Sequence, residues 1–401
     1  MFPLIAIISL SIILLGACRH VFRTRRRTTV AAIQALLEPR NTGDAADILS
    51  RIYPHGHLAL TRSSDILNPT SHDNFVAEAR KLIAPANPQQ HAEGAGAGMG
   101  VAQANPQPYP WGNFAKCAER CTEKFLPTEG VNFVAFIQSI TLCTILVRFY
   151  DVDPAIPSPL DIAFMTHALY HHSNRSSLLD ARELSDMTKI IERWVKGVRA
   201  SQALETIFPA YESMWRLVAI TLDYATRDVN RRNAFLDLSE NPTDRQFRAV
   251  KVKGREPSVE AIMKEVLRFH PPMCHIMRKS RHPWWMGLFY SPQEVADITS
   301  AHRSSAYGEH PEIFHAMRFH ITQPMDRLLA FGHGGLRCIA EEWAPMATAL
   351  IVAKVIDRVD DTKFIIAGNT SNMSVDHNIE SRWEGWVIRK REMAHSLSSG
   401  V

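Results

Sequence analysis

The chain has 401 residues, which is enough for one large hydrophobic core. Its 45 basic and 41 acidic residues nearly balance, so the charge does not indicate nucleic acid as a partner. Six cysteines are too few and too scattered for a disulfide framework, and we interpret them as mostly reduced.

Residues 2–18 are nearly all apolar, and an arginine-rich stretch follows them as far as Arg27. A run of about 17 apolar residues is the lower limit for crossing a bilayer, and basic residues on its downstream side favour leaving that side in the cytoplasm. We therefore predict an N-terminal transmembrane anchor over residues 1–18. A cleaved signal peptide is the main alternative, although the positive charge that usually precedes its apolar run is missing. Leu15-Gly-Ala-Cys18 also resembles a bacterial lipoprotein processing site, which the same missing charge disfavours.

Residues 19–83 mix short helical and strand-like pieces, with 58–61 as a candidate strand, and form the N-terminal part of the predicted catalytic domain. Residues 84–110 are rich in Pro, Gly, Ala and Gln and almost free of charge, which is typical of a flexible surface insertion. The glycines of this insertion neither follow a clear strand nor begin a helix, so they do not indicate a dinucleotide-binding loop.

Residues 111–390 carry the spacing of a mainly α domain, and 391–401 form a C-terminal tail. The segment 275–290 is richer in aromatic residues and is a candidate for short strands. The sequence therefore predicts a mainly α fold with small β-sheets. The expected helices are 131–147, 162–170, 179–199, 203–227, 258–269 (with Ser258 as a candidate N-cap) and 339–359.

A glycine-rich segment precedes Cys338 in the sequence Phe331-Gly-His-Gly-Gly-Leu-Arg-Cys. Its glycines remove side chains just before the cysteine, so the backbone can pass close to a flat ligand. The helix expected from residue 339 would place the sulfur at its positive end and lower the pKa of the thiol, and only a thiolate binds iron strongly.

The order Phe-Gly-x-Gly and then Cys at this offset resembles the haem-binding loop of the cytochromes P450. Residues 264–272 (KEVLRFHPP) are similar to the Glu-x-x-Arg helix of that family, and residues 311–319 (PEIFHAMRF) to its Pro-Glu-x-Phe and Arg-Phe segment. All three motifs stand in the family's order and at its ordinary separations. The resemblance covers residues 258–360 closely, 131–227 loosely, and the first 110 residues scarcely beyond the anchor.

The resemblance implies the cytochrome P450 fold and a haem b whose iron has the Cys338 thiolate as its axial ligand. The other residues implied to hold the haem are Phe331, Gly332, His333, Gly334, Arg337 and Arg278. Arg278 would pair with a haem carboxylate, and an ordinary surface arginine is the alternative. Glu265, Arg268 and Arg318 would form the buried charged triad of the family fold.

This chain departs from the family pattern on both sides of the haem. Leu336 stands where the family has Arg or His, and Ala340 replaces a glycine two residues after the cysteine. The acid and alcohol motif of the central helix is not found. Thr221 and Asp223 are the candidate proton relay, although residues two apart on a helix do not share a face. In the alternative interpretation Thr221 bonds a local carbonyl and Asp223 faces solvent.

The resemblance implies a mono-oxygenase that oxidises a lipophilic small molecule with dioxygen and electrons from an NADPH-cytochrome P450 reductase. The chain is similar to membrane-anchored fungal members of the family that act in secondary metabolism. This similarity implies a terpenoid or polyketide-like substrate, and an anchor in the endoplasmic reticulum membrane with the catalytic domain in the cytosol. Haem-dependent rearrangement, dehydration or cyclisation without oxygen insertion is an alternative. A haem-binding scaffold without turnover is another. Cys117 and Cys121 have the spacing of half a metal site, but without a second pair we interpret them as ordinary thiols.

Overall fold

The computed structural model of the chain describes residues 25–38, 69–84, 110–126, 130–174, 181–250, 256–279, 293–321, 328–334, 337–360, 364–367, 383 and 385–390. The expected anchor, the candidate strand 58–61, nearly all of the insertion 84–110 and the tail 391–401 lie outside the described residues. The domain boundaries expected from the sequence therefore stay predictions.

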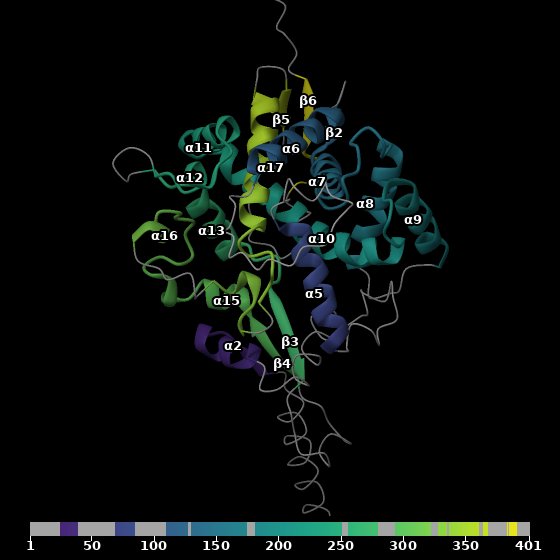
Figure 1. The fold of residues 1–401 in the computed structure, drawn as a ribbon. Coiled ribbons are helices and arrows are strands. Elements are labelled where there is room, and N and C mark those ends of the chain that lie inside the picture. Colours follow the sequence, from purple (N-terminus) through teal and green to yellow (C-terminus); the bar gives the residue numbers. More distant parts are fainter. Residues whose placement is uncertain are drawn as a thin grey trace, which may run out of the picture.

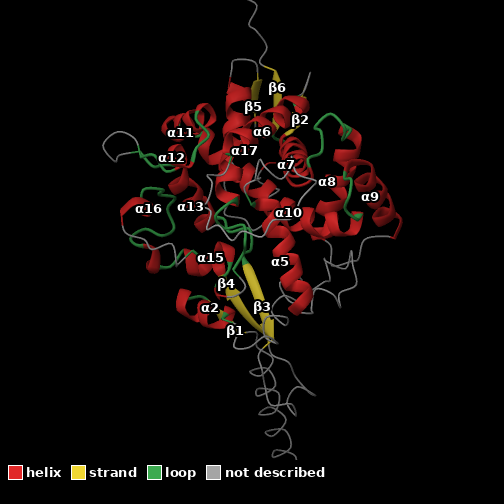
Figure 2. Cartoon of the chain, in the orientation of Figure 1, coloured by secondary structure: helices red, strands yellow, loops and turns green. Residues whose placement is uncertain are grey.

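Helices make up most of the described chain (Figure 2). They are α2 (Val30–Leu37), α5 (Pro69–Ile83), α6 (Trp111–Phe125), α7 (Phe133–Tyr150), α8 (Pro159–Asn174), α9 (Ala181–Trp194), α10 (Ala200–Thr226), α11 (Val229–Glu240), α12 (Asp244–Phe247), α13 (Val259–Phe269), α15 (Ile298–His302), α16 (Arg318–Ile321) and α17 (Ala344–Asp360), with the 3-10 turns η1 (Ser305–Tyr307) and η3 (Leu329–Phe331). The mainly α fold predicted from the sequence is confirmed.

Two small sheets lie at opposite ends of the helical body (Figure 1). The first has the order β1 (Arg25–Arg27), β4 (Gln293–Asp297), β3 (His275–Lys279), with β1 parallel and β3 antiparallel to β4. The second has the order β2 (Gly130–Asn132), β6 (Val387–Lys390), β5 (Phe364–Ala367), and both of its pairs are antiparallel. The small sheets are thus present as expected, and β3 lies in the segment 275–290.

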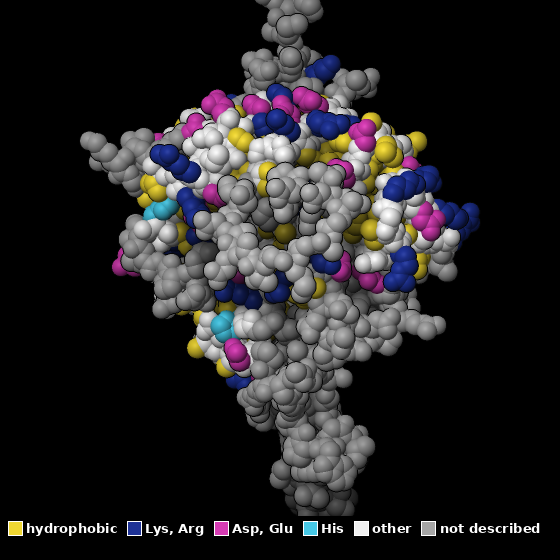
Figure 3. Space-filling model, viewed as in Figure 1, with side chains coloured by type: hydrophobic (Ala, Val, Ile, Leu, Met, Phe, Trp, Pro, Cys, Tyr) yellow, Lys and Arg dark blue, Asp and Glu magenta, His cyan; other side chains and the backbone are white. Residues whose placement is uncertain are grey.

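Strand β1 uses part of the basic cluster that follows the expected anchor. Arg26 pairs with Asp297 at 3.5 Å and Arg27 with Glu294 at 3.0 Å, both on β4. These arginines therefore attach the start of the described chain to a strand that lies far along the sequence. On the face shown in Figure 3, Lys and Arg side chains lie among Asp and Glu, in keeping with the nearly balanced charge.

Helix α7 lies in the core and packs against α10, α6 and α8. The Asn132 side chain caps it by accepting a hydrogen bond from the Ala135 amide at 3.0 Å. Among the described residues it is the one helix long and apolar enough to cross a membrane, but 67% of its apolar window is buried inside the fold. This burial indicates a core helix.

Helix α13 carries the central part of the candidate site. The Ser258 hydroxyl oxygen accepts a hydrogen bond from the Ala261 amide at 3.2 Å, the N-cap expected from the sequence. Its apolar positions are buried against α10, α11 and α17, and its Glu265 and Arg268 side chains are equally buried. A helix that takes two charges into a core must find partners for them there.

Candidate active site

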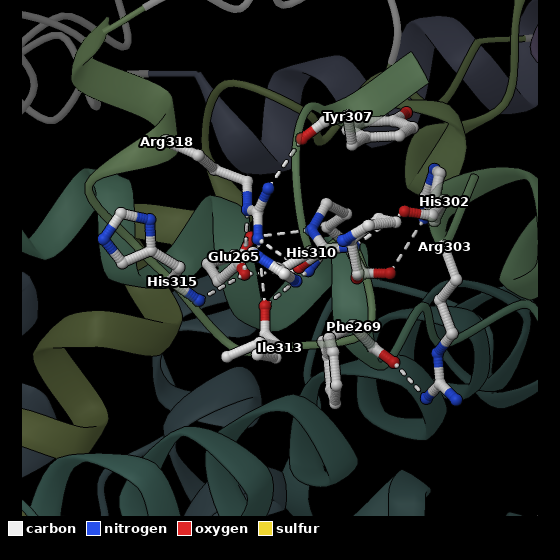
Figure 4. Close-up of polar contacts among 11 residues, drawn as sticks. Glu265, Phe269, His302, Arg303, Tyr307, His310, Ile313, His315 and Arg318 are labelled. Carbon is white, nitrogen blue, oxygen red and sulfur yellow. Dashed lines mark hydrogen bonds and ion pairs between the residues drawn. The ribbon is translucent and has the colours of Figure 1, made fainter. Parts of the chain in front are cut away.

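Glu265 lies at the centre of a buried ion-pair network (Figure 4). Arg268 binds both of its carboxylate oxygens, with Nε 2.7 Å from Oε2 and Nη2 2.8 Å from Oε1. Arg318 donates from Nε to Oε1 at 3.2 Å, and the His315 amide donates to the same oxygen at 2.7 Å. The structure therefore brings together the three charged residues that the motifs predicted.

Backbone carbonyls accept from the remaining N–H groups of Arg268 and from both Nη atoms of Arg318. Arg268 donates from Nη1 and Nη2, at 2.7–3.3 Å, to the carbonyl oxygens of His302, Pro311 and Ile313. Arg318 donates at 2.6–3.2 Å to those of Tyr307, His310 and Ile313. All five N–H groups of Arg268 thus have acceptors, which makes its burial tolerable and ties α13 to the segment 302–318.

The buried His302 connects this network with the segment that leads to Cys338. Its Nδ1 lies 3.1 Å from the carbonyl oxygen of Arg268, and the Leu329 amide donates to its Nε2 at 2.9 Å. Because an amide N–H can only donate, Nε2 is the acceptor and Nδ1 carries the proton. Burial lowers the pKa of His302 to about 3, so the ring is neutral at physiological pH. Sequence reasoning missed this residue, since a single histidine outside any motif gives no signal.

Two short backbone hydrogen bonds shape the loop before Cys338. The Gly332 amide donates to the Leu329 carbonyl at 2.9 Å, and the Cys338 amide donates to the Phe331 carbonyl at 2.7 Å. Gly332 and Gly334 have φ values of +80° and +65°, a region that favours glycine. The loop therefore folds back on itself and sets Cys338 beside Phe331; residues 335 and 336 lie outside the described part of the chain.

The Cys338 side chain is exposed, yet neighbouring protein desolvates its thiol enough to raise the pKa. A hydrogen bond from the Ala340 amide opposes this effect, and the nearby Glu341 adds to it. The expectation that a helix begins at residue 339 and lowers the thiol pKa is wrong. Residues 339–343 form turns, and α17 begins only at Ala344, too far from the sulfur for its dipole to dominate.

The other residues predicted to hold haem are spread over the loop and β3. His333 Nε2 lies 3.3 Å from Glu38 Oε2, so the end of α2 touches the loop. The Arg337 guanidinium pairs with Glu341. Arg278 lies on β3 opposite Glu294 of β4, and its side chain is outside the described residues.

Thr221 and Asp223 are both buried on α10 and bond to different partners. The Thr221 hydroxyl donates to Sδ of Met263 on α13 at 3.7 Å. Asp223 accepts from Arg227 Nε at 2.5 Å. Thr221 therefore bonds a sulfur rather than a carbonyl, and Asp223 does not face solvent, which corrects the alternative interpretation. The structure does not turn the two side chains toward one another.

An acid and an alcohol stand next to each other earlier on the same helix. Ser213 is exposed in the middle of α10, among turns that are largely buried, and its hydroxyl donates to the Pro209 carbonyl at 3.1 Å. Glu212 precedes it and pairs with Arg216. Sequence reasoning missed this pair, although Pro209 inside an apolar helix was a signal of a local irregularity in the backbone.

Among the described residues, Cys338 belongs to no cluster of possible metal ligands. Among the residues that the structure describes, no group of three or more His, Cys, Asp or Glu side chains could hold a metal ion. One thiolate is enough for an iron that already has the four nitrogens of a flat macrocycle, and Cys338 is exposed. The residues present therefore fit haem better than a metal ion held by protein ligands.

No family model matches the sequence, and the search of curated proteins gave no match. Solved cytochromes P450 share its fold. The haem domain of a cytochrome P450DA mutant matches with a TM-score of 0.56 and 16% identity over 92% of this chain and 86% of that one. The retinoic acid-bound cyanobacterial CYP120A1 matches with a TM-score of 0.53 and 12% identity over 91% and 88%. The chain has the cytochrome P450 fold, as its motifs predicted.

Proposed function

We propose that the chain is a haem-thiolate mono-oxygenase of the cytochrome P450 type, with Cys338 as the axial ligand of haem b. The observation that carries the proposal is the exposed Cys338 on a glycine loop that hydrogen bonds connect to the buried Glu265 network in a P450 fold. A bound haem would supply dioxygen activation, and the thiolate would add the electron density that favours O–O cleavage.

The loop residues have separate tasks in this proposal. The amide of Cys338 fixes the thiol through the Phe331 carbonyl, and the positive φ angles of Gly332 and Gly334 shape the turn that carries it. Arg278 is the first candidate for a haem carboxylate, because Arg337 already pairs with Glu341 and His333 with Glu38. An arginine fork suits a carboxylate partner in two hydrogen bonds.

Proton delivery to the distal side has two candidate pairs on α10. The pair Thr221 and Asp223 comes from the sequence, and the pair Ser213 and Glu212 comes from the structure. Exposure supports Ser213, since a relay must reach both solvent and the reacting oxygen. The side chains of both pairs are bonded, those of Thr221 and Asp223 to Met263 and Arg227. Ser213 donates to the Pro209 carbonyl and Glu212 pairs with Arg216, so exposure is the observation that favours the second pair.

Electrons would come from a membrane-bound NADPH-cytochrome P450 reductase, and the substrate would be a lipophilic small molecule of the terpenoid or polyketide type. The apolar residues 2–18 support a single-pass anchor in the endoplasmic reticulum with the catalytic domain in the cytosol. Mutating the arginines after this run and mapping protease access in microsomes would test the orientation.

A reduced carbon monoxide difference spectrum tests the proposal on the wild type, on Cys338→Ala and on the control Cys274→Ala. Cys274 is half-buried and its thiol donates to the Pro271 carbonyl at 3.5 Å, so its loss should leave any haem ligand intact. We expect a thiolate-type Soret shift in the wild type and the control, and its loss in Cys338→Ala. A wild type that binds no haem, or a shift that survives in Cys338→Ala, would overturn the proposal.

Haem-dependent rearrangement without oxygen insertion is the second candidate, favoured by the engaged side chains of Thr221 and Asp223. Labelled dioxygen separates the two, because the mono-oxygenase places one labelled atom in the product. Bound haem without turnover on any lipophilic substrate would instead support the scaffold.

A further inference from the structure

We propose that His302 is a positioning residue for Cys338, acting as a neutral bridge between the Glu-x-x-Arg helix and the ligand loop. The proposal rests on the proposed function, since it takes Cys338 as the haem ligand. It adds a residue from outside the three recognised motifs and gives its side chain a defined task.

His302 and Arg268 are bound to each other in both directions. The Arg268 guanidinium donates from Nη1 to the His302 carbonyl at 2.7 Å, while His302 Nδ1 donates to the Arg268 carbonyl at 3.1 Å. The ring also packs edge-on against Tyr307, with centroids 5.4 Å apart. These contacts fix both the position and the rotation of the imidazole on the end of α13 (Figure 4).

The other ring nitrogen holds the loop. Nε2 accepts from the amide of the buried Leu329, the first residue of η3. From there the Leu329 carbonyl accepts from the Gly332 amide, and the carbonyl of Phe331, the residue before Gly332, accepts from the Cys338 amide. One side chain thus links a helix locked by buried ion pairs to the turn that fixes the thiol.

Only a neutral histidine protonated on Nδ1 can form this bridge. Nε2 must be free of hydrogen to accept from Leu329, and Nδ1 must carry one to donate to Arg268. The charged groups that face the ring support this state, because the Arg268 guanidinium next to it disfavours a second positive charge. A side chain that lacks the Nε2 acceptor would leave the buried Leu329 amide without a partner.

Three substitutions separate the bridge from simple packing. His302→Gln places an oxygen acceptor near the Nε2 position, His302→Asn reaches only the Nδ1 position, and His302→Phe fills the space without either bond. The matched control is His320, whose Nε2 accepts from the Ser258 amide at 3.0 Å at the opposite end of α13. His320→Phe therefore removes a similar bond that has no connection with the ligand loop.

Two readouts do not depend on turnover. The first is hydrogen exchange of the Leu329 amide in the haem-free protein, where we expect at least about tenfold faster exchange in His302→Asn and His302→Phe, near wild-type exchange in His302→Gln, and no change in His320→Phe. The second is the thiolate-type Soret band of the loaded protein, which should shrink in the first two variants and return in His302→Gln.

The outcomes distinguish this inference from the function on which it rests. If the wild type shows the thiolate band and all three His302 variants keep it while losing thermal stability alike, His302 is a packing residue and the inference is wrong. If the wild type takes up no haem, the proposed function fails, and unchanged exchange at Leu329 would separately overturn the bridge.

Discussion

The Cys338 amide donates a 2.7 Å hydrogen bond to the Phe331 carbonyl, seven residues earlier in the chain. The bond closes the glycine loop at its two ends, so the backbone path of the loop sets the place of the thiol. The position of the candidate ligand therefore depends on backbone angles within the loop, and residues that control those angles should matter more than residues that merely line it.

Gly334→Ala tests this dependence. Gly334 has a φ of +65°, and a Cβ there would lie 3.1 Å from Glu38 Oε2. We expect a loss of about 1–2 kcal/mol in the free energy of unfolding, measured by urea denaturation, because the left-handed region disfavours side chains. Gly112→Ala is the control: it lies in α6 with no atom within 4 Å of a Cβ, and should stabilise by about 0.5–1 kcal/mol. Equal effects would contradict the assignment of strain to the loop.

Glu265→Gln tests the buried network. The substitution keeps the shape of the side chain but leaves the charges of Arg268 and Arg318 without their counter-ion in the core, which should cost about 3–5 kcal/mol. The control is Glu260→Gln on the same helix, whose partly exposed pair with Lys264 at 2.9 Å should be worth about 1 kcal/mol or less. Denaturant unfolding of both variants measures the difference, and a loss for Glu265→Gln as small as that of the control would show that the core tolerates the unpaired arginines.

Ser213→Ala and Thr221→Val form a matched pair on α10. Both remove a hydroxyl from the same helix, but only Ser213 is exposed. In the reductase-supported reaction, we expect Ser213→Ala to raise the share of NADPH electrons released as hydrogen peroxide by at least about twofold, because a lost proton relay leaves reduced oxygen unproductive. Thr221→Val should leave that share unchanged. The reverse result would restore Thr221 as the relay alcohol.

His302 should make stability depend on pH. Its pKa in the folded protein is lowered to about 3 from 6.5, so the unfolded chain binds a proton that the folded chain does not in this window. The stability that the neutral His302 contributes is therefore fully present above pH 6.5. As the pH falls from 6.5 toward 3, the free energy of unfolding decreases by about 1.4 kcal/mol for each pH unit. Urea unfolding of the wild type and His302→Gln isolates the slope, because other titrating groups cancel in the comparison. Parallel curves would mean that His302 titrates normally.

The thiols should differ in reactivity. A hydrogen bond with Cys117 and burial raise the pKa of Cys121, and a hydrogen bond with Cys121 and burial raise the pKa of Cys143. The pKa of Cys338 is raised as well, but Cys121 and Cys143 are fully buried whereas Cys338 is exposed. In the haem-free protein at mildly alkaline pH, iodoacetamide should label the exposed Cys338 and spare Cys121 and Cys143, as read by mass spectrometry.

Haem loading adds a control to the labelling experiment. It should protect Cys338 and leave labelling of the half-buried Cys117 unchanged. Labelling of Cys338 that persists at full haem occupancy would contradict its role as the ligand.

The sequence predicted a helix correctly where its N-cap and its apolar spacing are both present in neighbouring residues. Helix α13 was predictable because its cap, Ser258, and its apolar spacing are contiguous in the sequence. The start of α17 was missed because the spacing after Cys338 looked helical, although Pro345 in the first turn marks a helix start near residue 344.

Contacts between distant segments lay beyond sequence reasoning. Strand β1 pairs with β4, which lies far away in the sequence, and nothing in the three consecutive arginines of β1 indicates that partner. The approach of Glu38 to Gly334 and the bridge through His302 likewise join residues that belong to no shared pattern. The contacts among Glu265, Arg268 and Arg318 were predictable only because a family resemblance supplied those distant pairings, and Cys338 as the haem ligand stays a prediction of the same resemblance.

The short spacing between the proposed anchor and β1 limits how the domain can move. The proposed anchor would end at Cys18, and β1 begins at Arg25, where pairing with β4 joins the chain to the domain. Six intervening residues span at most about 25 Å even when fully extended. If the proposed anchor lies in a bilayer, the sheet containing β1, β3 and β4 would stay within that distance of the lipid, and the sheet at the opposite end of the helical body would lie farther from it.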